Sequence, residues 1–534
     1  MQDKKISSRW ATDEEVLTYN SVKVVKKDAK EGIAGVPIGS NGKNILVDTS
    51  EMHTLVIGST GSGKTQSITL PSINTMINNN ESIVVLDAEG EILSTVGKKL
   101  EENDYNIISI NFNNPKYGNH FNPLSLIEKY YKENELDKCI ELLQHISNSI
   151  FCDTKVNGKD PFWDNTASDY FQGLVMLALE NNTGNITFRN IFELSTRINE
   201  SDKNLNDMRI SIKTKVNSKS STYLSSTLSA PTETRKSIIT VFESKFKKFI
   251  LDDYMNEMMS ITDFSFEDIK NKKTCIFIIG NINEKYKSLY SITIEEIYNY
   301  LSVIKNDNRV NFLLDNFSFY SPILSLTNIL VSSRSKNIRF IVMLNSFEEL
   351  YAYYGKEAGE ILKSEFGIII YLISNQIGTL EEISRLCGYV YDKNEQIPLI
   401  SINELQRLNY FEALVLKQRC YPYKTKLIPN YQLEWNKDSN YQLKEHNIVN
   451  NNCNLFELIR DKEVMNRISK PNVDDLISKI DLKIEELEKQ EKQHNEQLKQ
   501  KEMIVNDLKD INLKELNDRK IVIDHTTITI YPKQ

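Results

Sequence analysis

The sequence predicts an α/β fold in which a mostly parallel sheet is covered by helices, with an all-α domain inserted into it and a C-terminal helical extension. Short runs rich in β-branched residues alternate with helix-like stretches, which is the pattern of a parallel sheet with helical crossovers. These runs fall into two clusters. Between residues 123 and 234 the strand signal fades and long amphipathic stretches replace it.

The composition is that of a globular protein without a uniformly charged surface. Among the 534 residues, 40% are hydrophobic and 26% are charged, and the formal net charge is −8. A negative balance excludes nucleic-acid binding over the whole surface, so any DNA contact has to be local. Apolar runs such as Gly367 to Ile373 are far shorter than the roughly 20 residues that a membrane-spanning helix needs. The 6 cysteines form no CxxC pair, which argues against a zinc or thiol redox site.

The elements suggest four regions along the chain. We expect an N-terminal segment over residues 1–43, a nucleotide-binding domain over 44–122 and 235–430, the inserted all-α domain over 123–234, and the extension over 431–534. The clearest strand candidates are His53–Ile57, Ser82–Leu86, Asn106–Asn111, Thr274–Ile279, Val310–Leu314, Arg339–Leu344, Gly367–Leu372 and Glu412–Leu416.

The extension carries its own pattern. Ile477, Ile480, Ile484 and Leu487 follow a 3-4-3 spacing among charged residues, which predicts a short coiled coil or helical hairpin. The terminal stretch IVIDHTTITIY alternates as a strand does, and it is expected to add to another sheet.

The strongest chemical signal is a phosphate-binding loop. The run Gly58-Ser59-Thr60-Gly61-Ser62-Gly63-Lys64-Thr65 matches G-x-x-x-x-G-K-[ST], directly after a strand and before a helix-compatible stretch. Glycines let backbone N–H groups turn toward phosphate oxygens at a helix N-terminus. Lys64 is therefore expected to reach the β- and γ-phosphates of ATP, and Thr65 to ligate Mg²⁺.

A second carboxylate is needed to hold Mg²⁺ and normally sits at the tip of an apolar strand. Asp315, at the end of Val310–Leu314, is the first candidate, and Asp87, at the end of Ser82–Leu86, is the alternative. Asp315 could instead cap the helix that follows.

In the order of its motifs the chain resembles the TraG-like type IV secretion coupling proteins, the hexameric DNA-transfer ATPases of bacterial conjugation. The resemblance extends over about Ser8 to Leu487. Its motifs are Ser8–Thr12, the phosphate loop, Val85–Glu91, Phe121–Leu124, Asp160–Trp163, Asp315, Ser333–Lys336 and Val473–Asp481.

The resemblance implies a RecA-like motor that forms a hexameric ring around single- or double-stranded DNA and docks a relaxase–DNA substrate, the relaxosome, to a type IV secretion channel. In such a ring ATP lies between subunits, and an arginine from the neighbour neutralises transition-state charge. Arg334 matches that family position, with a plain surface arginine as the alternative.

The sequence departs from the family at the hydrolysis site. Asn316 follows Asp315 where the family has Glu, and an amide cannot accept a proton from the attacking water. Asn345 stands where a Gln γ-phosphate sensor is usual, and Glu349 replaces a second Gln. These changes predict ATP and Mg²⁺ binding with weak or absent turnover, unless Glu89 supplies the missing carboxylate.

The family also carries a pair of membrane helices before the motif at Ser8, and the sequence shows none. We therefore expect a cytoplasmic protein that reaches the inner face of the cell membrane through a separate anchor protein, or one that acts free in the cytosol. From Arg209 to Lys248 there are nine Lys or Arg against two Glu, a stretch that could track DNA phosphates or be an ordinary solvated face. The rivals to a coupling motor are a hydrolysis-deficient, nucleotide-gated scaffold for cargo and an FtsK-like DNA translocase. The helical insertion and Phe121–Leu124 argue against the FtsK-like translocase.

Overall fold

A computed structural model of the chain forms two compact units, residues 1–459 and residues 460–534. In the first unit it describes residues 7–459 apart from 28, 30, 31, 43, 152–160, 185, 215–217, 281–285, 304, 305, 318–320, 393, 394, 434, 436–439 and 447–454. In the second unit it describes residues 484, 487, 489, 499, 519–523 and 528–532.

A 9-stranded sheet forms the centre of the first unit, in the order β14-β13-β10-β4-β9-β8-β5-β7-β6. Its strands are β4 (His53–Gly58), β5 (Ser82–Asp87), β6 (Asn106–Asn111), β7 (Thr274–Ile279), β8 (Val310–Leu314), β9 (Ile338–Leu344), β10 (Phe366–Ile373), β13 (Glu412–Lys417) and β14 (Tyr423–Lys426). The seven neighbouring strands β10, β4, β9, β8, β5, β7 and β6 pair in parallel. At one edge of the sheet β13 pairs antiparallel with β10, and β14 pairs antiparallel with β13. Each strand expected between residues 53 and 417 lies in this sheet, and the predicted α/β class is confirmed.

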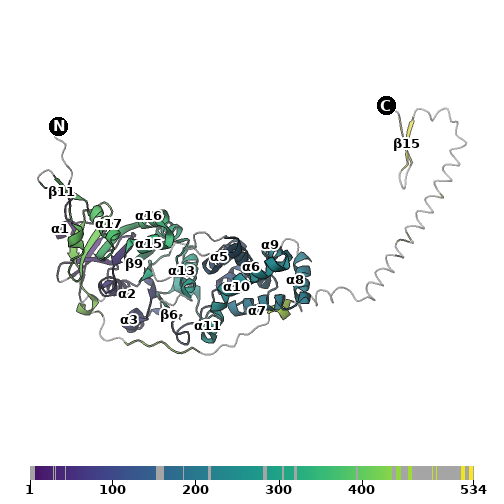
Figure 1. Ribbon diagram of the computed structural model, residues 1–534, viewed down its shortest axis with the longest axis horizontal. Helices are drawn as coiled ribbons and strands as arrows, with labels where there is room; N and C mark the ends of the chain where they lie inside the picture. Colours follow the sequence, from purple (N-terminus) through teal and green to yellow (C-terminus); the bar gives the residue numbers. More distant parts are fainter. Residues whose placement is uncertain are drawn as a thin grey trace. The chain divides into compact units, whose positions relative to one another are not determined.

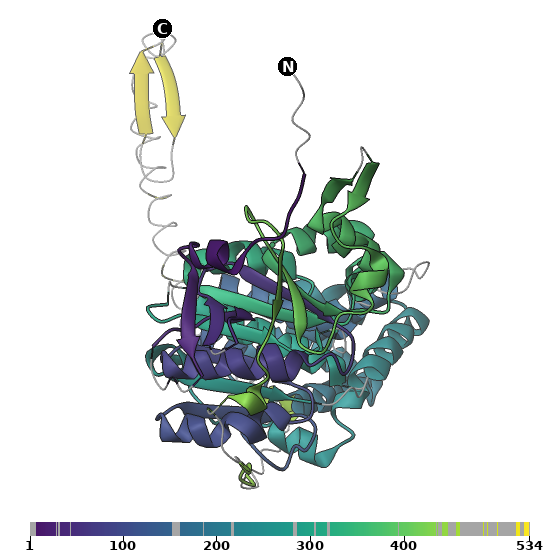
Figure 2. The same ribbon diagram turned by 90° about the vertical axis from the view of Figure 1, so that its left-hand side faces the viewer.

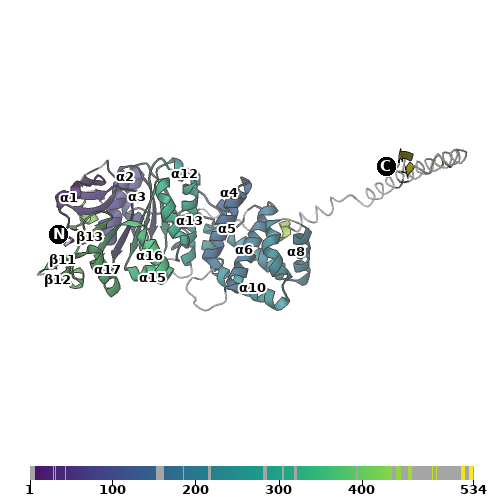
Figure 3. The same ribbon diagram turned by 90° about the horizontal axis from the view of Figure 1, so that it is seen from above.

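Alternate side chains of the strands feed two cores, one on each face of the sheet. On one face Val56 and Val85 pack with two helices, α2 (Leu70–Asn78) and α3 (Glu91–Glu102). On the other face Leu55 and Leu86 pack with the helices that connect the later strands. These helices are α13 (Lys287–Ser302), α14 (Leu326–Ser333), α15 (Phe347–Tyr354), α16 (Lys356–Ser364) and α17 (Ile377–Cys387). Figures 2 and 3 show the sheet between these two layers.

A block of helices lies between β6 and β7 in the sequence and beside the sheet in space (Figure 1). Its helices are α4 (Ser125–Lys132), α5 (Leu136–Phe151), α6 (Phe162–Glu180), α7 (Phe188–Asn199), α8 (Asp202–Thr214), α9 (Lys219–Ser229), α10 (Thr232–Phe246), η2 (Lys247–Phe249) and α11 (Asp253–Met258). Buried aromatic rings such as Phe171 and Phe246 fill its centre, 5.2 Å apart between ring centroids. The expected all-α insertion is therefore present, while its limits at residues 123 and 234 stay predictions.

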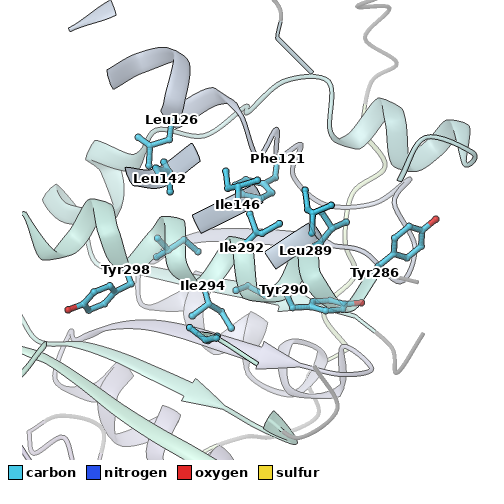
Figure 4. Close-up of a cluster of buried hydrophobic side chains, with 14 of the residues drawn as sticks. Phe121, Leu126, Leu142, Ile146, Tyr286, Leu289, Tyr290, Ile292, Ile294 and Tyr298 are labelled. Atoms are coloured by element: carbon cyan, nitrogen blue, oxygen red, sulfur yellow. The ribbon is translucent and has the colours of Figure 1, made fainter. Parts of the chain in front are cut away.

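Helix α13 joins the helical block to the sheet. In Figure 4 Leu289 and Ile292 lie beside Ile146 of α5, while Tyr290 and Ile294 point toward the strands on the other side of α13. All of these residues belong to one continuous core. The helical block and the sheet thus share buried apolar surface, which favours a fixed arrangement between them.

Smaller elements complete the first unit. A 3-stranded sheet of β1 (Val22–Lys26), β3 (Asn44–Asp48) and β2 (Val36–Ser40) lies near the N-terminus, and β11 (Tyr389–Asp392) pairs with β12 (Glu395–Pro398). The short helices are α1 (Asp13–Leu17), α12 (Phe266–Asn271), η5 (Arg334–Lys336), α18 (Ile402–Leu405) and η6 (Asn430–Gln432). Within the described ranges no helix is long and apolar enough to span a bilayer.

The second unit contains an antiparallel hairpin of β15 (Arg519–Ile523) and β16 (Ile528–Pro532). The stretch IVIDHTTITIY therefore contributes to two paired strands rather than to a single one, and its addition to another sheet stays a prediction. Of the predicted coiled-coil seam, Ile484 and Leu487 are helical and exposed, whereas Ile477 and Ile480 lie outside the described residues.

Candidate functional site

The phosphate loop follows β4, a strand that is buried along its whole length. Gly61 and Gly63 have φ angles of +78° and +88°, which a residue with a side chain adopts only under strain. The loop leads into η1 (Thr65–Thr69), a turn of π-helix that continues into α2. This is the strand–loop–helix context that the motif requires.

Lys64 is folded back into the loop, and its side chain is buried. Its Nζ donates to the carbonyl oxygen of Gly58, to that of Ser59 at 3.3 Å and to Asn345 Oδ1 at 3.1 Å. Burial lowers the pKa of Lys64, while the negative charges of Asp315 and Glu349 act in the opposite direction. The loop therefore holds one desolvated cation among oxygen atoms, at the position where phosphate oxygens bind in this motif.

Asp315 stands directly after β8, two strands away from β4 in the sheet. Its Oδ2 accepts a hydrogen bond from Thr65 Oγ1 at 3.1 Å, and its Oδ1 accepts one from the Asn316 backbone N–H at 2.9 Å. Burial raises the pKa of Asp315, and the Lys64 charge and the Thr65 hydroxyl oppose that rise. The residues expected to hold Mg²⁺, Thr65 and Asp315, are thus brought together.

Asp87 has a different environment. It ends β5, and its two carboxylate oxygens accept from the backbone N–H groups of Gly90 at 3.0 Å and Leu93 at 2.9 Å. Burial raises the pKa of Asp87 to about 6. The carboxylate therefore caps the first turn of α3, and Asp315, rather than Asp87, is the one that meets Thr65.

Glu349, which the sequence marked only as a replacement for a second family Gln, is a member of the site. Its two carboxylate oxygens accept from the Asn345 backbone N–H at 2.9 Å and from Asn345 Nδ2 at 2.8 Å. With its NH₂ group held by Glu349, the Asn345 amide presents Oδ1 to Lys64. The available signal was the spacing of four residues, since α15 begins just after Asn345.

The two other residues discussed for hydrolysis lie in contrasting places. Asn316 is half-buried beside Asp315 and has a φ of +49°, a left-handed conformation that Asn tolerates well. Glu89 is exposed and lines a cavity with Asn111 and Tyr441, and none of the described residues lining that cavity belongs to the phosphate loop. The geometry therefore gives no support to Glu89 as the replacement carboxylate.

Arg334 is not brought to the phosphate loop of its own chain. It is exposed and lies in η5, just before β9 begins, whereas the loop follows the end of the neighbouring parallel strand β4. Its charge acts on His53, the first residue of β4, where burial chiefly lowers the histidine pKa to about 4. The length of one strand, about 20 Å, separates Arg334 from the loop.

The basic stretch is partly engaged within the helical block. Arg209 Nε donates to the Leu228 carbonyl at 2.6 Å, Arg235 is buried, and Lys245 Nζ lies 2.6 Å from an Asp164 oxygen. These three side chains stabilise the packing of α6 to α10. The surface available for a phosphate backbone is correspondingly smaller than the sequence indicated.

A phosphate loop after a central parallel strand, with a carboxylate at the tip of a strand two places away, defines the class of P-loop α/β proteins with a RecA-like sheet. Residues 1–440 match the family described as "Type IV secretory system Conjugative DNA transfer", and the chain belongs to this family. The resemblance seen in the sequence motifs is confirmed.

Curated relatives support the assignment at low identity. The VirD4 protein of Rhizobium rhizogenes is 20% identical over 414 residues, covering 73% of this chain and 60% of that protein. The VirD4 protein of Agrobacterium fabrum is 21% identical over 412 residues, covering 72% of this chain and 60% of that protein. The chain thus matches about 60% of the length of these relatives.

Solved structures share the fold. The plasmid coupling protein TrwB in complex with the ATP analogue ADPNP superposes with a TM-score of 0.60 and 17% identity, covering 83% of this chain and 97% of that one. The same protein in complex with ADP and Mg²⁺ gives a TM-score of 0.58 and 16% identity, covering 83% and 96%.

Proposed function

We propose that this chain is an ATP- and Mg²⁺-binding coupling protein that recruits a relaxase–DNA substrate to a type IV secretion channel, as a ring-forming DNA translocase. The observation that carries the proposal is the convergence of Lys64, Thr65, Asp315 and Asn345 from three separate elements on one loop. Family membership supplies the biological setting.

The residues present fit a magnesium nucleotide. Ser62 Oγ is buried and has no hydrogen-bond partner within the described part of the chain, so it is a free donor inside the loop. Lys64 supplies the positive charge for the β- and γ-phosphates, and the Thr65 hydroxyl and the Asp315 carboxylate offer the hard oxygen ligands that Mg²⁺ prefers. Bound Mg²⁺ would neutralise charge on the phosphates. Solved structures of TrwB in complex with ADPNP and with ADP and Mg²⁺ support the same ligands here.

Asn345 is suited to sense the terminal phosphate. Glu349 fixes its amide on one side, and Oδ1 meets the Lys64 ammonium on the other. A γ-phosphate oxygen that binds Lys64 competes with Asn345 Oδ1 for the same N–H groups. Because Asn345 directly follows β9 and lies just before α15, a change at the phosphate can be passed to that helix.

Arg334 fits a role between subunits. A side chain at the amino end of β9 cannot serve the loop at the far end of β4 in its own chain, but an exposed arginine can reach the loop of a neighbour. A homo-oligomeric ring, a hexamer by the family resemblance, places ATP at such a junction. The arginine would then neutralise charge in the transition state.

The second candidate is a hydrolysis-deficient, nucleotide-gated scaffold that docks cargo without pumping DNA. The observation that favours it is Asn316, which offers an amide where hydrolysis needs a carboxylate, at a φ of +49° that suits Asn. Both candidates share the binding site, and turnover separates them. In either case a separate membrane anchor would hold a cytoplasmic protein at the inner face of the membrane, near the channel components.

Steady-state ATP hydrolysis tests the proposal. Wild type and Lys64→Ala are compared with no DNA, with single-stranded DNA and with duplex DNA. Turnover that DNA stimulates and that Lys64→Ala abolishes supports the translocase, whereas ATP binding without turnover in any condition supports the scaffold. Turnover that Lys64→Ala leaves unchanged contradicts both, because the activity then comes from another site. In a donor strain whose own copy is deleted, DNA transfer restored by wild type and not by Lys64→Ala supports the coupling role.

A further inference from the structure

Three aromatic side chains gather beside the phosphate loop on the side away from the hydrolysis residues. Tyr410 and Tyr431 are 70% and 67% exposed, although tyrosine is a residue of intermediate burial. Phe411 lies between them, with ring centroids 5.3 Å from Tyr410 and 6.2 Å from Tyr431, both in edge-to-face geometry. We call Tyr410, Phe411 and Tyr431 the aromatic shelf.

The shelf is attached to the loop by direct contacts. The Tyr410 hydroxyl donates to the Gly61 carbonyl oxygen at 2.9 Å. Phe411 lies so close to Gly63 that a Cβ at that glycine would come within 2.9 Å of the phenyl ring. Tyr431 belongs to η6, which is held near the helix that follows the loop by a hydrogen bond of 3.2 Å from Asn74 Nδ2 to Asn430 Oδ1. The shelf therefore belongs to the wall of the nucleotide site.

The backbone at the shelf is strained and held in place. Phe411 has a φ of +65°, which is rare for a bulky side chain. Its carbonyl oxygen accepts from Leu427 N–H at 2.8 Å, and the adjoining turn is closed by Glu412, whose carboxylate accepts from Asn409 N–H at 2.9 Å. Strain of this kind persists where the surroundings over-determine the conformation, and it clusters at functional sites.

The sheet order gives the direction of a bound nucleotide. The groups for the terminal phosphate, Asn345 after β9 and Asp315 after β8, lie on one side of β4. The shelf lies on the other side, since Phe411 directly precedes β13 and β13 is separated from β4 only by β10. A nucleotide with its γ-phosphate toward β8 and β9 has its base toward β13.

We propose that Tyr410, Phe411 and Tyr431 form the nucleobase site of this chain, in which the base stacks on exposed tyrosine rings. The inference rests on the proposed nucleotide binding and deepens it, because it names the residues that take the base. Rings bind a base through its π-face, and such stacking is sequence-tolerant because every base has one. The shelf thus adds affinity for a nucleoside without contributing to phosphate binding.

The test compares ATP with inorganic tripolyphosphate, which carries the phosphates without a base. Calorimetric titrations in Mg²⁺ use the full chain as wild type, Lys64→Ala, Tyr410→Ala, Tyr410→Phe, Tyr431→Ala and Tyr431→Phe. The control is Tyr254→Ala, a tyrosine of α11 that is 49% exposed and lies in the helical block. Tyr410→Phe keeps the ring and removes only the hydrogen bond to Gly61.

The proposal predicts that wild type binds ATP at least about 10-fold more tightly than tripolyphosphate, from the usual strength of base–aromatic stacking. Tyr410→Ala and Tyr431→Ala then lose about 10-fold in ATP affinity and keep their tripolyphosphate affinity, while both Phe variants and Tyr254→Ala stay within about 2-fold of wild type. Equal affinity of wild type for ATP and tripolyphosphate refutes the proposed base site. It is also refuted if the two Ala variants lose the same affinity for both ligands, or if they lose no ATP affinity. If neither ligand binds, or if Lys64→Ala binds both as wild type does, the nucleotide site itself is refuted.

Discussion

Asn316 offers the sharpest test of how the site hydrolyses ATP, because the change Asn316→Glu restores a carboxylate at a position whose backbone is unusual. Asn316 has a φ of +49°, and its N–H donates to Asp315 Oδ1 at 2.9 Å. A residue other than Gly, Asn or Asp pays about 1 to 2 kcal/mol in the left-handed region. Asn316→Glu and Asn316→Gln should therefore both lower the free energy of unfolding by about 1 kcal/mol relative to wild type.

The two variants should differ only in chemistry. A positioned general base contributes about 10²- to 10⁴-fold, so Asn316→Glu should raise ATP turnover by a factor in that range while Asn316→Gln does not. Steady-state hydrolysis with saturating ATP and Mg²⁺ measures the difference, and thermal unfolding measures the shared strain. The reasoning is refuted if both variants gain turnover equally, or if Asn316→Glu binds ATP and stays as inactive as Asn316→Gln. Wild-type turnover at ordinary motor rates would refute the inferred weakness of the amide.

Three further predictions follow from contacts elsewhere in the first unit. Glu349→Gln replaces one of the two carboxylate oxygens that hold the Asn345 amide beside Lys64. In parallel titrations ATP affinity should therefore fall several-fold more than ADP affinity, and equal losses for the two nucleotides would contradict the role of Asn345 as a sensor. Gly173→Ala places a Cβ 2.4 Å from a Leu224 carbon, so it should lower the free energy of unfolding by about 1 to 3 kcal/mol. Denaturant titration should show a smaller loss when the same change is made in a Leu224→Ala background, whereas strictly additive losses would speak against this contact. His145 Nδ1 lies 3.7 Å from a Glu295 oxygen, and this contact raises the pKa of the histidine. The pair therefore stabilises the fold below the ordinary histidine pKa, and the stabilisation is lost as the pH rises through the raised pKa. His145→Gln should lower the melting temperature more at pH 6 than at pH 8, and the same loss at both pH values would argue against the pair.

The strands of the central sheet could be predicted because they are buried on both faces. Runs such as His53–Gly58 and Ser82–Asp87 are almost continuously apolar, and a run of this kind between turn signals indicates a strand of a parallel sheet. β1 is different, since only Val22 and Val25 are buried and the rest of the strand is exposed. A short half-exposed strand of this kind gives a weak periodic signal. The other two strands of the 3-stranded sheet, β2 and β3, are mostly buried and were not predicted either.

Some residues of the site could be predicted from the sequence around them, whereas others depend on contacts between distant parts of the chain. The phosphate loop is a contiguous motif, and Asp315 follows an apolar strand, so both could be identified from local sequence. The pair Asn345 and Glu349 is also local, since four residues separate them. The position of Tyr431 beside the loop depends instead on strand order and on how helices pack over the sheet. Tyr410 is separated from Gly61 by 349 residues, and no spacing rule connects such positions.

At the C-terminus the alternation of IVIDHTTITIY indicated strand correctly but not its partner. The structure pairs Ile521 with Ile530, so both strands of the hairpin come from the same end of the chain. A two-residue period is the same for an edge strand and for either arm of a hairpin, so it does not identify the partner of a strand.

Equilibrium binding of ATP in the presence of Mg²⁺ tests the phosphate site most directly, with wild type and Lys64→Ala titrated side by side and each titration repeated with the Mg²⁺ chelated. The cluster of Lys64, Thr65, Asp315 and Asn345 predicts saturable binding of one ATP per chain that weakens without Mg²⁺ and that Lys64→Ala reduces at least about 10-fold, the effect expected when a charged hydrogen bond is lost. No binding by wild type, or equal binding by both proteins, would contradict an ATP site in this loop.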